Sequence, residues 1–145
     1  MAGTIVADTL QADSTSTLVL KNGVANTPPT IQDSAGTQIG TFCRAWVNFN
    51  GTTNTGGFCT IRASFNVTSV ADNGTGDYTV NFTTAMPDAN YAGVCMTQPP
   101  TGVTSSGFEI KDAVSPTTLA FRLSTFRTTT GTTNDPPFVN VAFFR

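Results

Sequence analysis

Two aspartates, Asp72 and Asp77, bracket the run Asn-Gly-Thr-Gly in the stretch DNGTGDYTVNF. Closely spaced carboxylate and amide oxygens could bind Ca²⁺. An EF-hand loop, however, needs oxygen ligands at its first, third and fifth positions and a glutamate at its twelfth. Here the third position is Gly74, and valine or asparagine stands where later ligands are due. We therefore predict a hairpin turn at Asn73-Gly74 with an aspartate on either side.

The chain offers few groups for catalysis. It has no histidine, which excludes Ser-His and Cys-His pairs and most zinc sites. It also lacks the glycine-rich phosphate-binding motifs. A two-carboxylate glycosidase would have to use Asp88, Glu109 and Asp112, but the last two have an odd spacing on one predicted strand and so point to opposite faces. We interpret these carboxylates as solvated and expect a protein that is not an enzyme, without catalytic residues, metal or cofactor.

Three cysteines, Cys43, Cys59 and Cys95, make an odd count without a Cys-x-x-Cys spacing. This pattern favours free buried thiols in a reducing compartment over a disulfide framework. The alternative is one disulfide, between Cys43 and Cys59.

The first residues have no basic region and no sustained apolar run, so we predict no secretory signal. No segment approaches the ~18 apolar residues of a membrane span, so we expect no membrane insertion. Without a signal, four Asn-x-Ser/Thr triplets are interpreted as coincidental rather than glycosylated. They begin at Asn50, Asn66, Asn73 and Asn81.

The composition indicates one compact domain with a weakly charged surface. Only 11% of the 145 residues are charged, against roughly 25% in typical soluble domains. The 11 phenylalanines argue against a disordered chain. The net charge of -2 and the singly scattered basic residues argue against a nucleic-acid partner.

Large apolar side chains are distributed unevenly along the chain. Residues 1–42 hold a single phenylalanine, Phe42, whereas residues 43–145 hold the other ten, the one tryptophan and both tyrosines. We therefore place the hydrophobic core in 43–145. We predict that residues 1–42 form an extended attachment arm, which has no core of its own and must pack against another protein surface. The alternative is a disordered tail.

The second part alternates apolar and polar residues, as a strand with one buried face does. The pattern predicts strands over 61–71 and 77–83, with Ile61, Ala63, Phe65 and Val67 on one face. About seven such segments separated by turn signals predict an all-β fold, an antiparallel β-sandwich.

The chain ends in FVNVAFFR, which is apolar on both faces. A half-exposed edge strand of this kind would invite aggregation. We therefore expect the strand inside a sheet, with one face in the core and the other covered by a neighbouring subunit or by the arm. We expect Phe143 on the covered face and Phe144 in the core, and leave the reverse assignment open.

Residues 44–96 resemble a module of tailed-bacteriophage virion proteins. The resemblance rests on four successive motifs: AWVNFNG, IRASFNV, NGTGDY and NFTTAMPDANY. Residues 97–145 match that family only in style, and the opening MAGTIVADTLQ is similar to the starts of phage fibre and structural proteins.

The family implies trimeric β-rich proteins displayed on the virion after assembly in the host cytoplasm. One function it implies is a capsid decoration (cement) protein that binds the major capsid protein. The other is the tip of a tail fibre or tailspike that binds host surface glycans. A chain that starts at its own methionine and has no shaft favours capsid decoration. A secreted lectin-like module is a third possibility, which the missing signal disfavours.

Overall fold

The computed structural model describes residues 31–145. None of these residues is helical, and every strand pairing is antiparallel. The strands are β1 (Ile31–Gln32), β2 (Gln38–Gly40), β3 (Cys43–Thr55), β4 (Phe58–Phe65), β5 (Val67–Gly74), β6 (Asp77–Phe82), β7 (Ala92–Gln98), β8 (Ser106–Ile110), β9 (Ala120–Arg127) and β10 (Phe138–Phe144).

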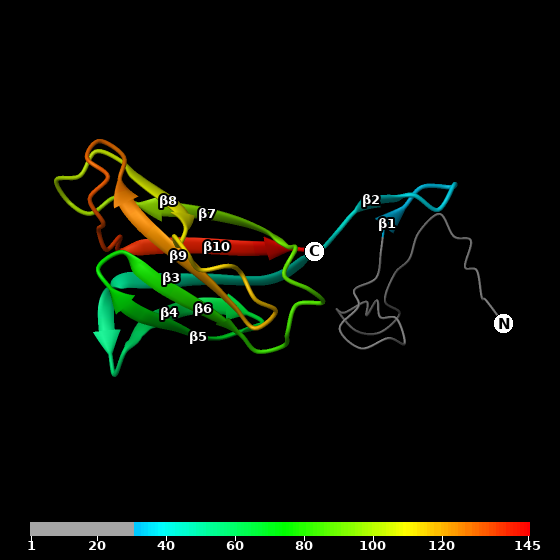
Figure 1. Ribbon diagram of the computed structural model, residues 1–145, viewed down its shortest axis with the longest axis horizontal. Coiled ribbons are helices and arrows are strands. Elements are labelled where there is room, and N and C mark those ends of the chain that lie inside the picture. The colour runs from blue at the N-terminus through cyan, green and yellow to red at the C-terminus, as the bar shows by residue number, and fades with distance from the viewer. Residues whose placement is uncertain (1–30) are drawn as a thin grey trace, which may run out of the picture.

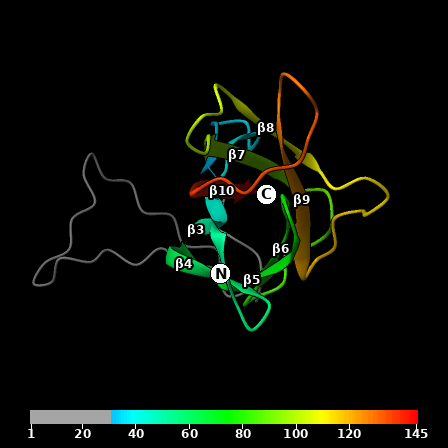
Figure 2. The ribbon, with the colours of Figure 1, turned by 90° about the vertical axis from the view of Figure 1, so that its left-hand side faces the viewer.

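Strands β3 to β10 form one sheet in the order β7-β10-β3-β4-β5-β6-β9-β8. The sheet curls into a nearly closed barrel, so that its two end strands, β7 and β8, lie side by side (Figures 1 and 2). The structure thus differs from the predicted sandwich of about seven strands. Alternation along a strand indicates one buried face, but it cannot tell a sheet that curls onto itself from two sheets that stack.

The small ribbon β1–β2 falls within the predicted arm and lies beyond the end of the barrel at which β10 stops (Figure 1). The chain joins the barrel through Thr41, whose hydroxyl donates to the carbonyl of Arg145 at 2.9 Å. The barrel itself begins at Cys43. The rest of the predicted arm, residues 1–30, lies outside the described residues.

Four aromatic rings form the centre of the core at this end of the barrel. Phe143 is fully buried and packs edge-on against Phe82, Tyr91 and Phe121, with ring centroids 5.0, 5.8 and 5.1 Å apart. Each ring comes from a different part of the sequence, so this cluster joins β6, β9, β10 and the loop before β7. Aromatic pairs of this geometry add about 0.5–1.5 kcal/mol beyond the area that they bury.

A buried polar contact joins the strands at the other end of the barrel. The Tyr78 hydroxyl lies 2.7 Å from Oδ1 of Asp135 and 3.1 Å from the carbonyl oxygen of Gly51. Asp135 also accepts from the Gly76 amide at 2.7 Å, and the Gly51 amide donates to the carbonyl of Pro136. A Cβ on Gly51 would meet the Tyr78 hydroxyl oxygen at 2.6 Å, so only glycine fits there.

A β-bulge in β4 reverses the side of the sheet to which the following side chains of the strand point. The register of β4 against β3 shifts between Ile61 and Ala63. Beyond this point Phe65 lies opposite Trp46 and is 55% exposed. The expectation that Ala63 and Phe65 share a face with Ile61 is therefore wrong, because the extra residue of a bulge reverses the alternation.

The predicted strand 61–71 is also broken in two at Asn66, which has a left-handed φ of 55°. Asparagine tolerates this conformation better than most residues. Its side-chain amide donates to the carbonyls of Arg44 and Thr84, and its Oδ1 accepts from the Thr84 amide. Asn66 therefore fastens the corner between β4 and β5, and both of its amide hydrogens are engaged.

The hairpin turn between β5 and β6 lies two residues later than predicted. Asn73 and Gly74 belong to the strand, where the register shifts, and the turn itself is made by Thr75 and Gly76. The Gly74 amide donates to Oδ1 of Asp72 at 2.9 Å. This local bond holds Gly74 in the strand and leaves Gly76, with φ of 67°, to reverse the chain.

All three cysteines are free in the structure, so the alternative disulfide between Cys43 and Cys59 does not form. Cys59 and Cys95 are buried, and Cys43 is half-buried. Burial raises the pKa of both Cys59 and Cys95 to about 12, so these thiols stay protonated.

Strand β10 lies inside the sheet between β7 and β3, as predicted. The reverse assignment of its last two phenylalanines is the correct one, because Phe143 is in the core and Phe144 is half-buried on the outer face. We expect Phe143→Ala to lower the free energy of unfolding by roughly 3–5 kcal/mol and Phe144→Ala by about 1 kcal/mol. Urea unfolding measures both, and equal losses would contradict this placement.

Candidate interaction surface

The acidic residues singled out in the sequence do not form a metal site. Asp77 accepts from Nε and a terminal nitrogen of Arg122 at 2.8 and 2.9 Å, and Lys111 lies 3.4 Å away. Asp72 accepts from a backbone amide of its own turn. Among residues 31–145 no cluster of three or more acidic or cysteine side chains could hold a metal ion.

The three glycosidase candidates lie on two different segments. Asp88 is in the loop before β7 and forms an ion pair with Arg145 at 2.6 Å. Glu109 is exposed on β8, and Asp112 follows the end of that strand, which stops at Ile110 rather than at 112. The three carboxylates therefore do not come together as one group in the described part of the chain.

One row of apolar side chains crosses four strands on the outer face of the barrel. Val94 on β7 lies opposite Ala142 on β10, Ala142 opposite Trp46 on β3, and Trp46 opposite Phe65 on β4. Val94, Trp46 and Phe65 are 53%, 39% and 55% exposed. We call these four residues the apolar row. Because they are direct register partners, they form a continuous stripe rather than scattered exposed residues.

Polar side chains form a second row beside the apolar row. Asn48 donates to Oδ1 of Asn140 at 2.5 Å, and Arg62 donates to Oδ1 of Asn48. The Arg62 guanidinium lies 3.8 Å above the ring of Phe138 and donates to the carbonyl of Pro137. These contacts orient the amides and the guanidinium, so the polar row has a defined pattern of donors and acceptors.

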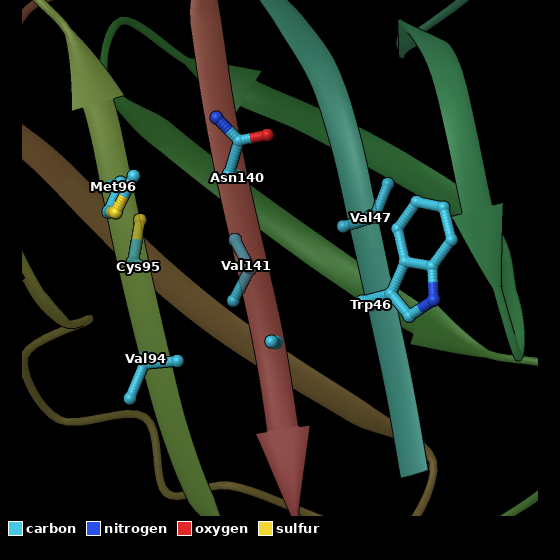
Figure 3. Close-up of a pocket in the computed structure, with 8 residues that line it drawn as sticks. Trp46, Val47, Val94, Cys95, Met96, Asn140 and Val141 are labelled. Carbon is cyan, nitrogen blue, oxygen red and sulfur yellow. The ribbon is translucent and has the colours of Figure 1, made fainter. Parts of the chain in front are cut away.

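The small side chain of Ala142 leaves a hollow between its larger neighbours, with a volume of about 250 Å³. Figure 3 shows Val94 and Met96 on β7 and Trp46 on β3, with β10 between them. Met96 is 72% exposed, and its flexible thioether adapts well to a partner. The face therefore combines an apolar hollow with an oriented polar border.

Only part of this surface was visible in the sequence. Residues 138–144 are apolar on both sides of the strand, which indicates that the outer face of β10 is covered by another part of the chain or by a partner. Trp46 alternates with the core residues Ala45 and Val47, which is the signal that could have placed it outside. The sequence alone could not show that Phe65 belongs to the apolar row, because its position on the outer face depends on the bulge in β4.

No family model matches the chain, and neither a curated protein nor a solved structure is significantly similar to it. Within the described residues no helix is both long and apolar enough to cross a lipid bilayer.

The Asp77 ion pair predicts a pH dependence of stability. The hydrogen bonds from Arg122 lower the pKa of Asp77 from its usual 3.8. A carboxylate with a lowered pKa stabilises the fold above its unfolded-state pKa, and this contribution is lost as the pH falls through the folded pKa. At pH 7, Asp77→Asn should lower the free energy of unfolding by about 1–2 kcal/mol.

Urea unfolding between about pH 6 and pH 3 tests this expectation. The difference between wild type and Asp77→Asn should shrink as the solution is acidified, because the wild type then loses the same interaction. The Asp88–Arg145 pair is exposed and present in both proteins, so it contributes equally to both curves. A difference that stays constant over this range would contradict the proposed role of Asp77.

Proposed function

We propose that this protein is a structural component of a tailed-bacteriophage virion, a homotrimeric capsid decoration protein that binds the major capsid protein and is displayed on the head. The proposal starts from the four motifs in residues 44–96. The apolar row is the structural observation that carries it, because a stripe of exposed Trp46, Phe65 and Val94 suits a permanent protein contact.

The apolar row serves, in this proposal, as the contact between copies of the chain. Its members carry no charge, and the nearby Arg62 is already engaged by Asn48 and the Pro137 carbonyl. Burying the four residues of the apolar row therefore desolvates no charged side chain of the row itself, and Arg62 stays at its border, held by hydrogen bonds to neutral groups. A threefold assembly would also present three identical attachment arms on one body, which raises the affinity for a repeating capsid surface.

A second candidate function is a tail fibre or tailspike tip that recognises host glycans. The observation that favours it is the exposed Trp46 ring beside the oriented amides of Asn48 and Asn140. An aromatic ring flanked by hydrogen-bonding amides is well suited to a sugar, which has apolar faces and hydroxyl edges. Neither candidate requires catalytic chemistry, and we propose that the protein is not an enzyme.

The copy number of the chain in purified virions distinguishes the two candidates. A decoration protein covers the head, so its band on a quantitatively stained gel should be close to stoichiometric with the major capsid protein. Fibre and spike proteins occur only at the tail and would be scarce relative to that band. Absence of the chain from virions would contradict both candidates.

A further inference from the structure

The barrel has an open seam between its end strands β7 and β8. The two strands follow one another in the chain, and the Thr97 hydroxyl reaches the Ser106 carbonyl at 3.5 Å. No backbone hydrogen bond joins them in the part of the chain that the structure describes. Apart from the Ser106 carbonyl, both facing edges therefore present the unpaired backbone N–H and C=O groups of a free strand edge.

The wall of the seam formed by β8 is apolar and poorly covered. Phe108 and Ile110 lie opposite Thr125 and Leu123 of β9, which are both buried. Register partners share a face of the sheet, so Phe108 and Ile110 point to the inner side. They are nevertheless 45% and 54% exposed, because β7 does not close over them.

The opposite wall of the crevice includes Gly93 of β7, which contributes no side chain. A Cβ built on Gly93 would sit 3.5 Å from the rings of Phe121 and Phe143, an ordinary contact. The resulting crevice has a volume of about 90 Å³ and reaches Cys95 and Val141 on its floor. An apolar crevice of this size takes an apolar group more readily than water.

A ligand for this crevice must satisfy two different features. Its side chains must be apolar, to cover Phe108 and Ile110, and its backbone must be extended, to pair with a free strand edge. An extended peptide with alternating side chains meets both requirements by adding a strand to the edge. A compact apolar molecule would fill the crevice and leave the edge groups without partners.

We propose that residues 17–20 of this chain, Thr-Leu-Val-Leu, dock in the crevice between β7 and β8. These residues lie outside the described part of the structure, and their three large apolar side chains are adjacent and uncharged. The 11 residue steps from Leu20 to Ile31 can span at most about 36–40 Å when extended, which exceeds the length of the edge strand β7, Ala92–Gln98. The free edge of β7 then pairs with the backbone of this segment.

The place where the chain enters the barrel supports this occupant. The Thr41 hydroxyl donates to the carbonyl of Arg145, the residue that follows β10. Phe144, the last residue of β10, lies opposite Ala92 at the start of β7. The crevice opens beside this point, at Tyr91 and Gly93. Ile31 pairs with Gly40, the residue before Thr41, and Figure 1 shows the ribbon β1–β2 at the same end of the barrel.

Photocrosslinking on the full chain tests the proposal. A benzophenone amino acid replaces Leu18, the purified protein is irradiated, and mass spectrometry maps the attached peptides. We expect attachment to residues 91–95 and 106–110. A product of single-chain mass means that a chain fills its own crevice, and a two-chain product means that it fills that of a sister subunit. Either size supports the proposal.

Two variants make the result decisive. Gly93→Val fills the crevice with a side chain for which the Cβ has room, and Phe108→Asp removes its apolar wall. Each should lower attachment at these peptides roughly tenfold or more, since each removes the burial of about one large aliphatic side chain. Leu119→Asp, at an exposed site on another segment, is the matched control and should leave attachment unchanged. Attachment to the apolar row, no attachment at all, or equal attachment in every folded variant would overturn the proposal.

Discussion

The structure depends on a buried hydroxyl that joins distant segments of the chain. Tyr78 is fully buried, and its ring packs edge-on against Phe49 at 5.1 Å. Burial and the neighbouring Asp135 carboxylate raise the pKa of its hydroxyl, so the hydroxyl keeps its proton and donates. Because Asp135 also accepts from the hairpin turn at Gly76, this contact holds β3, β6 and the segment before β10 together. The sheet can then curl around one apolar interior, and a buried donor lacking this acceptor would cost about 1–3 kcal/mol.

Once the sheet is curled, its inner and outer faces have different roles. The inner face is filled by aromatic and branched side chains, with the Phe143 cluster at one end and Tyr78 at the other. The outer face of β7, β10, β3 and β4 keeps the apolar row, and the seam between β7 and β8 keeps two free edges. Both features are energetically unfavourable in an isolated chain. Their presence on a chain with so little charge supports the proposal that it works through contacts between proteins.

The all-β class and the position of β10 inside the sheet could be predicted, because period-two alternation reports directly which face of a strand is buried. The curl of the sheet could not, because it depends on which strands become neighbours. Phe65 was placed on the wrong face because one bulged residue near Ala63 reverses the alternation. The turn was misplaced because the Gly74 amide donates to the Asp72 carboxylate, and this bond keeps Gly74 in the strand. The apolar row joins residues from four strands and becomes visible only when their register is known.

We propose that the apolar row joins copies of this chain into a trimer. Sedimentation equilibrium at micromolar concentration measures it most directly, on the wild type and on a variant carrying Trp46→Ser and Phe65→Ser. Both side chains are on the outer face and partly exposed, so the double variant should keep its cooperative melt. We expect the wild type to have three times the 15.2 kDa chain mass and the folded variant to have the mass of one chain. A monomeric wild type, or a variant that remains trimeric, would contradict it.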